Sequence, residues 1–106
     1  MTDERTVMSI VVSTNWPYVT PEQYDAVSEI IRFDEDPPEG AISHTLWFTE
    51  GGLIVVDVWR TREDYELFAR DRLMPATEQV PGLHGEPTVT FHELHTQAIV
   101  HATAAA

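Results

Sequence analysis

Apolar and polar residues follow four short strand-type patterns and two helical patterns along this chain. Residues 7–14 are mostly apolar and β-branched, which predicts a central strand buried on both faces. Pro17 is expected to end this strand, because proline lacks the N–H that a β-ladder needs. Residues 41–50 and 53–60 predict two further strands, and the alternation over residues 87–95 predicts a fourth.

The two middle strands are linked by Gly51-Gly52. A glycine pair between two β-rich runs predicts a two-residue hairpin turn, because both glycines can adopt a positive φ. Thr61 ends the second of these strands and can cap the helix that follows. Pro75 is expected to end or kink that helix near Met74.

The first helix has a strong start signal in Thr20-Pro21-Glu22-Gln23. Thr20 is the expected N-cap, Pro21 suits the first helical position, and Gln23 completes a capping box. A helical stripe of apolar residues follows, made of Tyr24, Val27, Ile30 and Ile31. The helix is expected to close at Phe33, before an acidic loop over residues 34–40.

The element order is therefore β-α-β-β-α-β, which indicates an α+β, ferredoxin-like fold. In this fold a four-stranded antiparallel sheet carries both helices on one face. We expect a single domain over residues 7–96, between a flexible lead-in of residues 1–6 and a C-terminal tail of residues 97–106.

The composition argues against several classes of function. The 106 residues include no cysteine and no lysine, so thiol nucleophiles, zinc–cysteine sites and Schiff-base lysines are excluded. The net charge is −12, which argues against binding to nucleic acid or to an anionic membrane surface. No apolar run is long enough to cross a bilayer and the N-terminus is acidic, so we expect a soluble cytoplasmic protein. No nucleotide-binding motif occurs, so no cofactor is expected.

A family resemblance rests on residues 56–65, Val-Asp-Val-Trp-Arg-Thr-Arg-Glu-Asp-Tyr, and continues from Phe68 to residues 73–76, Leu-Met-Pro-Ala. A strand that ends in an aromatic and a basic residue, followed by a capped helix with an early aromatic, resembles the antibiotic-biosynthesis-monooxygenase-like domains of the dimeric α+β-barrel superfamily. The resemblance implies an oxidoreductase of secondary metabolism that forms a homodimer, with the two sheets packed face to face. It also implies a pocket in each subunit between the sheet and the helices.

The third predicted strand indicates where a second subunit would pack. Its two faces consist of Ile54, Val56 and Val58 on one side and of Leu53, Val55, Asp57 and Trp59 on the other. The second of these faces is too apolar for a sheet that is open to solvent. We therefore expect this second face, together with Trp47, to form the dimer seam.

His44 is the leading candidate for chemistry. It shares a predicted strand face with Ile42, Leu46 and Phe48, so it is an ionisable group on an otherwise apolar surface. Buried there, it would act as a base or as a polar anchor for a ligand, with Asn15 as a hydrogen-bond partner. The alternatives are a structural histidine bonded to the backbone and a turn role for Asn15.

Further residues are expected to line the same pocket. Tyr65 is also a catalytic candidate, because its hydroxyl could orient a phenolic or quinonoid substrate. The residues expected to bind the substrate are Trp16, Phe48, Phe68 and Arg72. The alternatives are core packing for Tyr65 and Phe68, and interaction with the helix dipole for Arg72.

No metal site is expected. In a strand, His92 and His95 point to opposite faces, and His44 and His92 would lie on opposite edge strands of the sheet. The heme-degrading branch of the superfamily does not fit, because Phe68 and Glu78 stand where that branch has a tryptophan and a histidine.

The sequence thus predicts a cofactor-independent monooxygenase-like enzyme that acts on an aromatic or polyketide-type small molecule. Two alternatives stay open. One is a cyclase or isomerase in the same pocket, and the other is a non-catalytic dimeric domain for ligand binding or stress response. The substrate cannot be derived from the fold alone.

Overall fold

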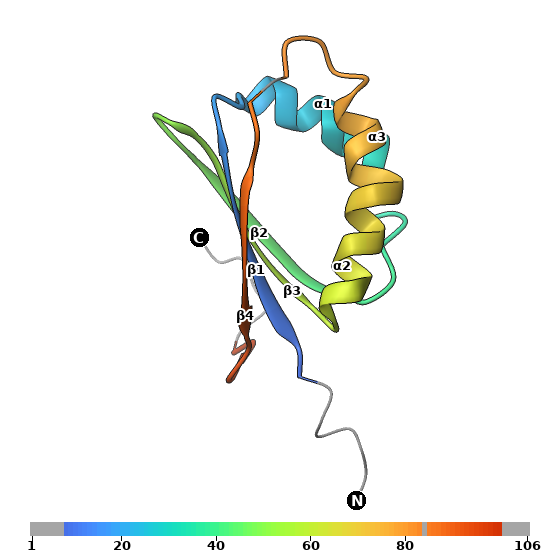
Figure 1. The fold of residues 1–106 in the computed structure, drawn as a ribbon, viewed down its shortest axis with the longest axis vertical. Helices are drawn as coiled ribbons and strands as arrows, with labels where there is room; N and C mark the ends of the chain where they lie inside the picture. Colours follow the sequence, from blue (N-terminus) through green and yellow to red (C-terminus); the bar gives the residue numbers. More distant parts are fainter. Residues whose placement is uncertain (1–7, 84, 101–106) are drawn as a thin grey trace, which may run out of the picture.

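The computed structural model describes residues 8–83 and 85–100 of the chain. One antiparallel sheet, in the order β2-β3-β1-β4, contains β1 (Ile10–Pro17), β2 (Ala41–Thr49), β3 (Gly52–Trp59) and β4 (Thr88–Glu93). One face of it is covered by α1 (Pro21–Ile31), α2 (Arg62–Phe68), the π-helical turn η2 (Ala69–Leu73) and α3 (Met74–Thr77), as Figure 1 shows. This arrangement confirms the predicted α+β, ferredoxin-like fold. The predicted lead-in, residues 1–6, and residues 101–106 of the predicted tail lie outside the described residues.

The start of α1 has the predicted capping box. The Thr20 hydroxyl accepts a hydrogen bond from the Gln23 backbone N–H, and the Gln23 side chain accepts one from the Thr20 N–H, both at 3.1 Å. The helix ends at Ile31, earlier than predicted, because Arg32 adopts the left-handed conformation (φ 57°) that often terminates helices. In the predicted stripe, Val27 and Ile31 are buried, Tyr24 is partly buried and Ile30 is exposed.

The helix that follows β3 continues through the predicted break at Pro75. Thr61 caps its start by accepting a hydrogen bond from the Asp64 N–H at 3.0 Å. At η2 the helix widens, and the Met74 N–H bonds to the carbonyl of Ala69, five residues earlier. Pro75 has no N–H, and in a regular α-helix its ring would press on an earlier carbonyl, so the wider turn allows one more helical turn.

The β2–β3 hairpin turns one residue earlier than predicted. Thr49 pairs with Gly52, so the two turn residues are Glu50 and Gly51. Gly52 lies within β3 with a φ of 140°, and a Cβ atom there would collide with the backbone of β1. Pro17, which was expected to end the first strand, is the last residue of β1 and lies opposite Gly52.

The strand register decides which face of the sheet is buried. Residues opposite each other in neighbouring strands point to the same side of the sheet. Trp59 lies opposite Ile10, faces the helices and has no exposed surface. Trp47 lies opposite Ile54 and faces away from the helices, with 47% of its surface exposed.

The predicted position of the dimer seam is therefore wrong. Trp47 and Trp59 do not share a face, and the face that includes Trp59 is the core rather than an open surface. The buried core residues beneath the helices are Val12, Val27, Ile31, Trp59, Tyr65, Phe68, Ala76 and Val80. Within the described residues no helix is both long and apolar enough to span a membrane.

A pair of glycine substitutions tests this hairpin geometry. We expect Gly52→Ala to lower the free energy of unfolding by about 1–3 kcal/mol, because alanine disfavours this φ and its Cβ would meet the β1 backbone. Gly51→Ala is the matched control, since its Cβ would meet only the Thr49 hydroxyl oxygen at 3.7 Å. Urea unfolding of both variants measures the difference, and equal losses would contradict the register described above.

Candidate active site

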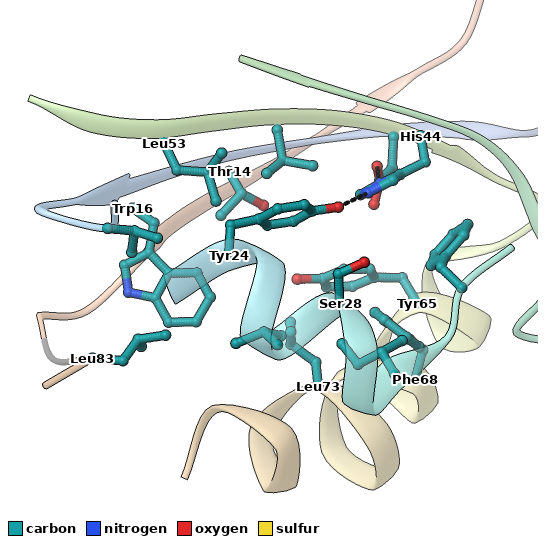
Figure 2. A pocket seen from close by; sticks show the side chains of 16 residues that line it. Thr14, Trp16, Tyr24, Ser28, His44, Leu53, Tyr65, Phe68, Leu73 and Leu83 are labelled. Carbon is teal, nitrogen blue, oxygen red and sulfur yellow. Dashed lines mark hydrogen bonds and ion pairs between the residues drawn. The ribbon is translucent and has the colours of Figure 1, made fainter. Parts of the chain in front are cut away.

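A cavity of about 80 Å³ lies between the sheet and the helices. Its wall is mainly apolar and aromatic, and Figure 2 shows the side chains that converge on it. The polar side chains in the wall are those of Thr14, Tyr24, Ser28, His44, Asp57 and Tyr65. A concave, mainly apolar space with a few convergent polar groups is the usual form of a small-molecule site.

Asp57 is a buried carboxylate with a hydrogen-bond partner for each oxygen. It lies on the inner face of β3 and is only 5% exposed. His44, directly opposite in β2, places its Nδ1 2.7 Å from Oδ1 of Asp57. Trp59 donates its Nε1–H to Oδ2 at 3.2 Å. These contacts supply the donors that a carboxylate needs when it is removed from water.

The other imidazole nitrogen of His44 faces Tyr24. The Tyr24 hydroxyl oxygen lies 3.0 Å from Nε2, and Figure 2 shows the hydroxyl directed at the ring. The hydrogen positions are assigned from the partners: a carboxylate only accepts, so Nδ1 of His44 carries a hydrogen towards Asp57. In the neutral imidazole, Nε2 then accepts the hydrogen bond of the Tyr24 hydroxyl. The three side chains form one hydrogen-bonded chain that ends at the cavity.

Aromatic packing fixes the plane of the imidazole. The ring of Phe33 stacks on that of His44, with centroids 4.6 Å apart and an interplanar angle of 21°. Phe33 in turn meets Trp59 and Phe68 edge to face, with centroids 6.4 and 5.9 Å apart. The imidazole is therefore held in orientation by hydrogen bonds at both nitrogens and by a ring against its face.

Two tyrosines present neutral hydroxyls to the cavity. Burial raises the pKa of Tyr24 and of Tyr65 above the ordinary value for a phenol. The nearby hydroxyls of Ser28 and Thr14 offset part of this shift, and the negative charge of Asp57 adds to it. Both tyrosines therefore remain protonated at neutral pH and can donate hydrogen bonds.

Four residues that the sequence pointed to line the cavity: His44, Tyr65, Trp16 and Phe68. The Trp16 Nε1–H donates to the carbonyl of Gly85 at 3.2 Å, which fastens the loop before β4 to the end of β1. Phe48 is not in the cavity wall, but it packs edge to face on Tyr24, with centroids 6.3 Å apart.

The surroundings of His44 differ from those predicted in two respects. The register of β2 shifts at a bulge near its start, so Ile42 is 51% exposed and does not accompany His44 on the inner face. Asn15 lies opposite Ile54, on the outer face of the sheet, and is exposed. Asn15 is therefore not the hydrogen-bond partner of His44, since strand alternation directs it away from the cavity.

Arg72 also lies outside the cavity wall. Its Nη2 donates to the backbone carbonyls of Ile31 and Asp36, at 2.5 and 2.9 Å. Its guanidinium carbon lies 5.9 Å from the centroid of Phe68. These contacts connect η2 to the end of α1 and to the loop that follows, which is a structural role rather than the predicted contact with the substrate.

Tyr24 and Asp57 were not recognised as site residues from the sequence. Tyr24 was assigned to the apolar stripe of α1, and Asp57 to the predicted dimer seam. The available signal was a single carboxylate on an otherwise apolar strand face, because a buried carboxylate requires a donor nearby. The turn predicted at Gly51-Gly52 would pair His44 with Trp59. The sequence therefore did not reveal that Asp57 is the partner of His44.

The histidines of the described segments are dispersed. His44 lies on the inner face of β2, at one edge of the sheet. His92 lies opposite Val11, on the outer face of β4, at the other edge. Over residues 8–83 and 85–100, no group of three or more histidine, aspartate or glutamate side chains is arranged to hold a metal ion.

Comparison with protein-family models and with curated proteins finds no significant match. Solved structures are similar in fold. The monooxygenase ActVA-Orf6 of Streptomyces coelicolor, in complex with nanaomycin D, is 21% identical, with a TM-score of 0.54 over 92% of this chain and 96% of its own. The cofactor-independent oxygenase SnoaB of Streptomyces nogalater is 14% identical, with a TM-score of 0.59 over 86% of this chain and 96% of its own. NE2512 of Nitrosomonas europaea, a protein of unknown function, is 12% identical, with a TM-score of 0.62 over 91% of this chain and 98% of its own.

Identities at this level establish the fold and not the reaction. The agreement extends over most of each chain. The chain therefore has the fold of the antibiotic-biosynthesis-monooxygenase-like domains, as its sequence predicted.

Proposed function

We propose that this protein is a cofactor-independent monooxygenase-like enzyme that acts on an aromatic or polyketide-type small molecule. The observation that carries the proposal is the hydrogen-bonded His44–Asp57 pair in the wall of an apolar cavity. The chain contains no lysine or cysteine that could serve as a nucleophile instead. A histidine oriented by a buried carboxylate is a suitable general base. The fold shared with ActVA-Orf6 and SnoaB supports the same assignment by analogy.

The chemistry requires only a base and dioxygen. Removal of a proton from an acidic, electron-rich ring system of the anthrone type gives an anion that molecular oxygen can oxidise directly. At the reacting CH₂ carbon, two C–H bonds are replaced by one C=O bond, and the second oxygen atom leaves as water. His44 accepts the first proton and returns it when water forms, while Asp57 stabilises the imidazolium in between.

The size of the cavity limits how the substrate binds. Its volume of about 80 Å³ is smaller than the engineered apolar cavities of about 150 Å³ that bind benzene. The cavity in this conformation is therefore too small to enclose an aromatic ring completely. Leu83, in the loop before β4, is a partly exposed part of that wall, so its displacement would enlarge the cavity without breaking the sheet.

Oxygen uptake with an anthrone substrate tests this function. We expect His44→Gln to lower kcat by about 100-fold or more, because general-base catalysis contributes on the order of 10²–10⁴-fold. His92→Gln is the matched control, since His92 lies on the outer face of β4. Conversion of the substrate without oxygen uptake would indicate a cyclase or isomerase, and binding without conversion would indicate a non-catalytic ligand-binding domain. Either result would overturn the oxygenase proposal.

We also propose that the protein is a homodimer that pairs through the outer face of the sheet. Trp47 on this face is 47% exposed, and the partly exposed Ile54 and Val56 lie beside it. The segment after β4 reaches the same face, because the Gln97 side chain donates a hydrogen bond to the Ser43 hydroxyl. An apolar area of this kind favours burial against a second copy.

Native mass spectrometry of a charge substitution tests the dimer. We expect the wild-type protein to have the mass of a dimer, and Trp47→Glu to have that of a monomer, because a carboxylate would be buried at the interface. Leu67→Glu is the matched control, since Leu67 is a comparably exposed apolar residue (41%) on α2 rather than on the sheet. A monomeric wild type would contradict the proposal.

A further inference from the structure

The hydrogen bond between Tyr24 and His44 places the tyrosine in front of the base. The hydroxyl oxygen of Tyr24 lies 3.0 Å from Nε2 of His44, and Asp57 lies at Nδ1. Both nitrogens of the imidazole therefore have protein partners. A substrate that approaches from the cavity meets the Tyr24 hydroxyl, which forms part of the wall, as Figure 2 shows.

The Tyr24 oxygen keeps an acceptor position for a ligand. In the neutral state its hydrogen is donated to Nε2 of His44, and the neighbouring Ser28 hydroxyl can use one lone pair, which leaves the other available. A phenol or enol can donate its own hydrogen to that oxygen. This acceptor position of Tyr24 suits a ligand with an acidic O–H group. It is less suited to a ligand group that can only accept hydrogen bonds.

We propose that Tyr24 is a catalytic residue that relays a proton from an acidic phenol or enol O–H of the substrate to His44. The inference rests on the proposed function and deepens it, because it names the group of the substrate that the base acts on and the residue that contacts it. In this step the substrate O–H bond breaks and a new O–H bond forms on Tyr24. The Tyr24 proton moves to Nε2 at the same time, so the products are a substrate anion, a neutral Tyr24 and an imidazolium.

The relay leaves each charge with a partner. The substrate anion accepts a hydrogen bond from the neutral Tyr24 hydroxyl, and the imidazolium of His44 lies beside the carboxylate of Asp57, 2.7 Å away. Hydrogen bonds that involve ionised groups are stronger than neutral ones, so the anion is stabilised in the apolar cavity. Asp57 is a positioning residue here, because it acts through His44 and does not contact the substrate.

His44 also reaches the edge of the molecule. It belongs to β2, an edge strand of the sheet, and its side chain is 24% exposed, whereas that of Asp57 is 8% exposed. The imidazole therefore lies at the boundary between the cavity and solvent. Tyr24 thus connects the interior of the pocket to a base that reaches the surface.

Oxygen-uptake kinetics of Tyr24→Phe test the relay with an anthrone substrate, whose enol tautomer carries the O–H group on which Tyr24 would act. The substitution removes one oxygen atom and keeps the ring that stacks against its neighbours. We expect kcat to fall by about 100-fold, within the range of general acid–base contributions. Tyr18→Phe is the matched control with unchanged kcat, since Tyr18 is 75% exposed and lies outside the cavity wall. An unchanged or increased kcat for Tyr24→Phe would overturn the relay, because a free Nε2 would then act on the substrate directly.

A binding measurement without oxygen separates the relay from the oxygenase function. The probes are 4-nitrophenol, whose anion is detected by its absorbance, and 4-nitroanisole, which has the same ring and no acidic hydrogen. We expect Tyr24→Phe to weaken the binding of the nitrophenol anion by about 10- to 100-fold, the usual value of a hydrogen bond to a charged group. Binding of nitroanisole should stay within about twofold of the wild type, because the apolar wall is conserved.

The two measurements assign each failure to one proposal. If the wild type ionises the bound nitrophenol through Tyr24 but consumes no oxygen, the relay stands and the oxygenase function is overturned. If oxygen uptake depends on His44 but not on Tyr24, the function stands and the relay is overturned. Equal losses for nitrophenol and nitroanisole, or a wild type that binds neither probe, would also overturn the relay. Thermal unfolding of the variants confirms that each is folded.

Discussion

The burial of the Asp57 carboxylate is the constraint on which the rest of the site depends. A carboxylate removed from water is costly unless donors surround it, and loss of one partner of a buried pair typically costs about 3–5 kcal/mol. Here the donors are the imidazole of His44 and the indole N–H of Trp59. Because the carboxylate only accepts hydrogen bonds, Nδ1 of His44 carries the hydrogen of the neutral imidazole, and Nε2 faces Tyr24. A single buried charge thus organises the polar side of an apolar cavity.

The helices complete the cavity from the opposite side. Thr61 caps α2 immediately after β3, which brings Tyr65 and Phe68 over the sheet and against Trp59. The π-helical turn η2 lets the helix continue past Pro75, and the last residue of this turn, Leu73, lies in the cavity wall. Such a turn in the wall of a pocket is a common feature of functional sites. The same helix is tied to the end of α1 by the guanidinium of Arg72.

The fold alone does not determine the chemistry of this protein. Domains of this architecture include oxygenases and proteins of unknown function, at identities of 12–21% to this chain. The proposed general base therefore depends on particular residues of this chain. Asp57, His44 and Tyr24 come from β3, β2 and α1, three elements that are brought together only by the sheet and the helix packed on it.

The sequence by itself determined the order of the elements and both helix N-caps, and it singled out His44 as a candidate, because these follow from local patterns of capping residues and alternation. Only the tertiary structure decided the partners of His44. The turn at Glu50-Gly51 instead of Gly51-Gly52 pairs His44 with Asp57, and the register sets Asn15 on the opposite face. The packing of α1 on the sheet brings the Tyr24 hydroxyl to Nε2. Strand register and helix packing are long-range properties, and a shift of one residue in a turn changes every cross-strand neighbour.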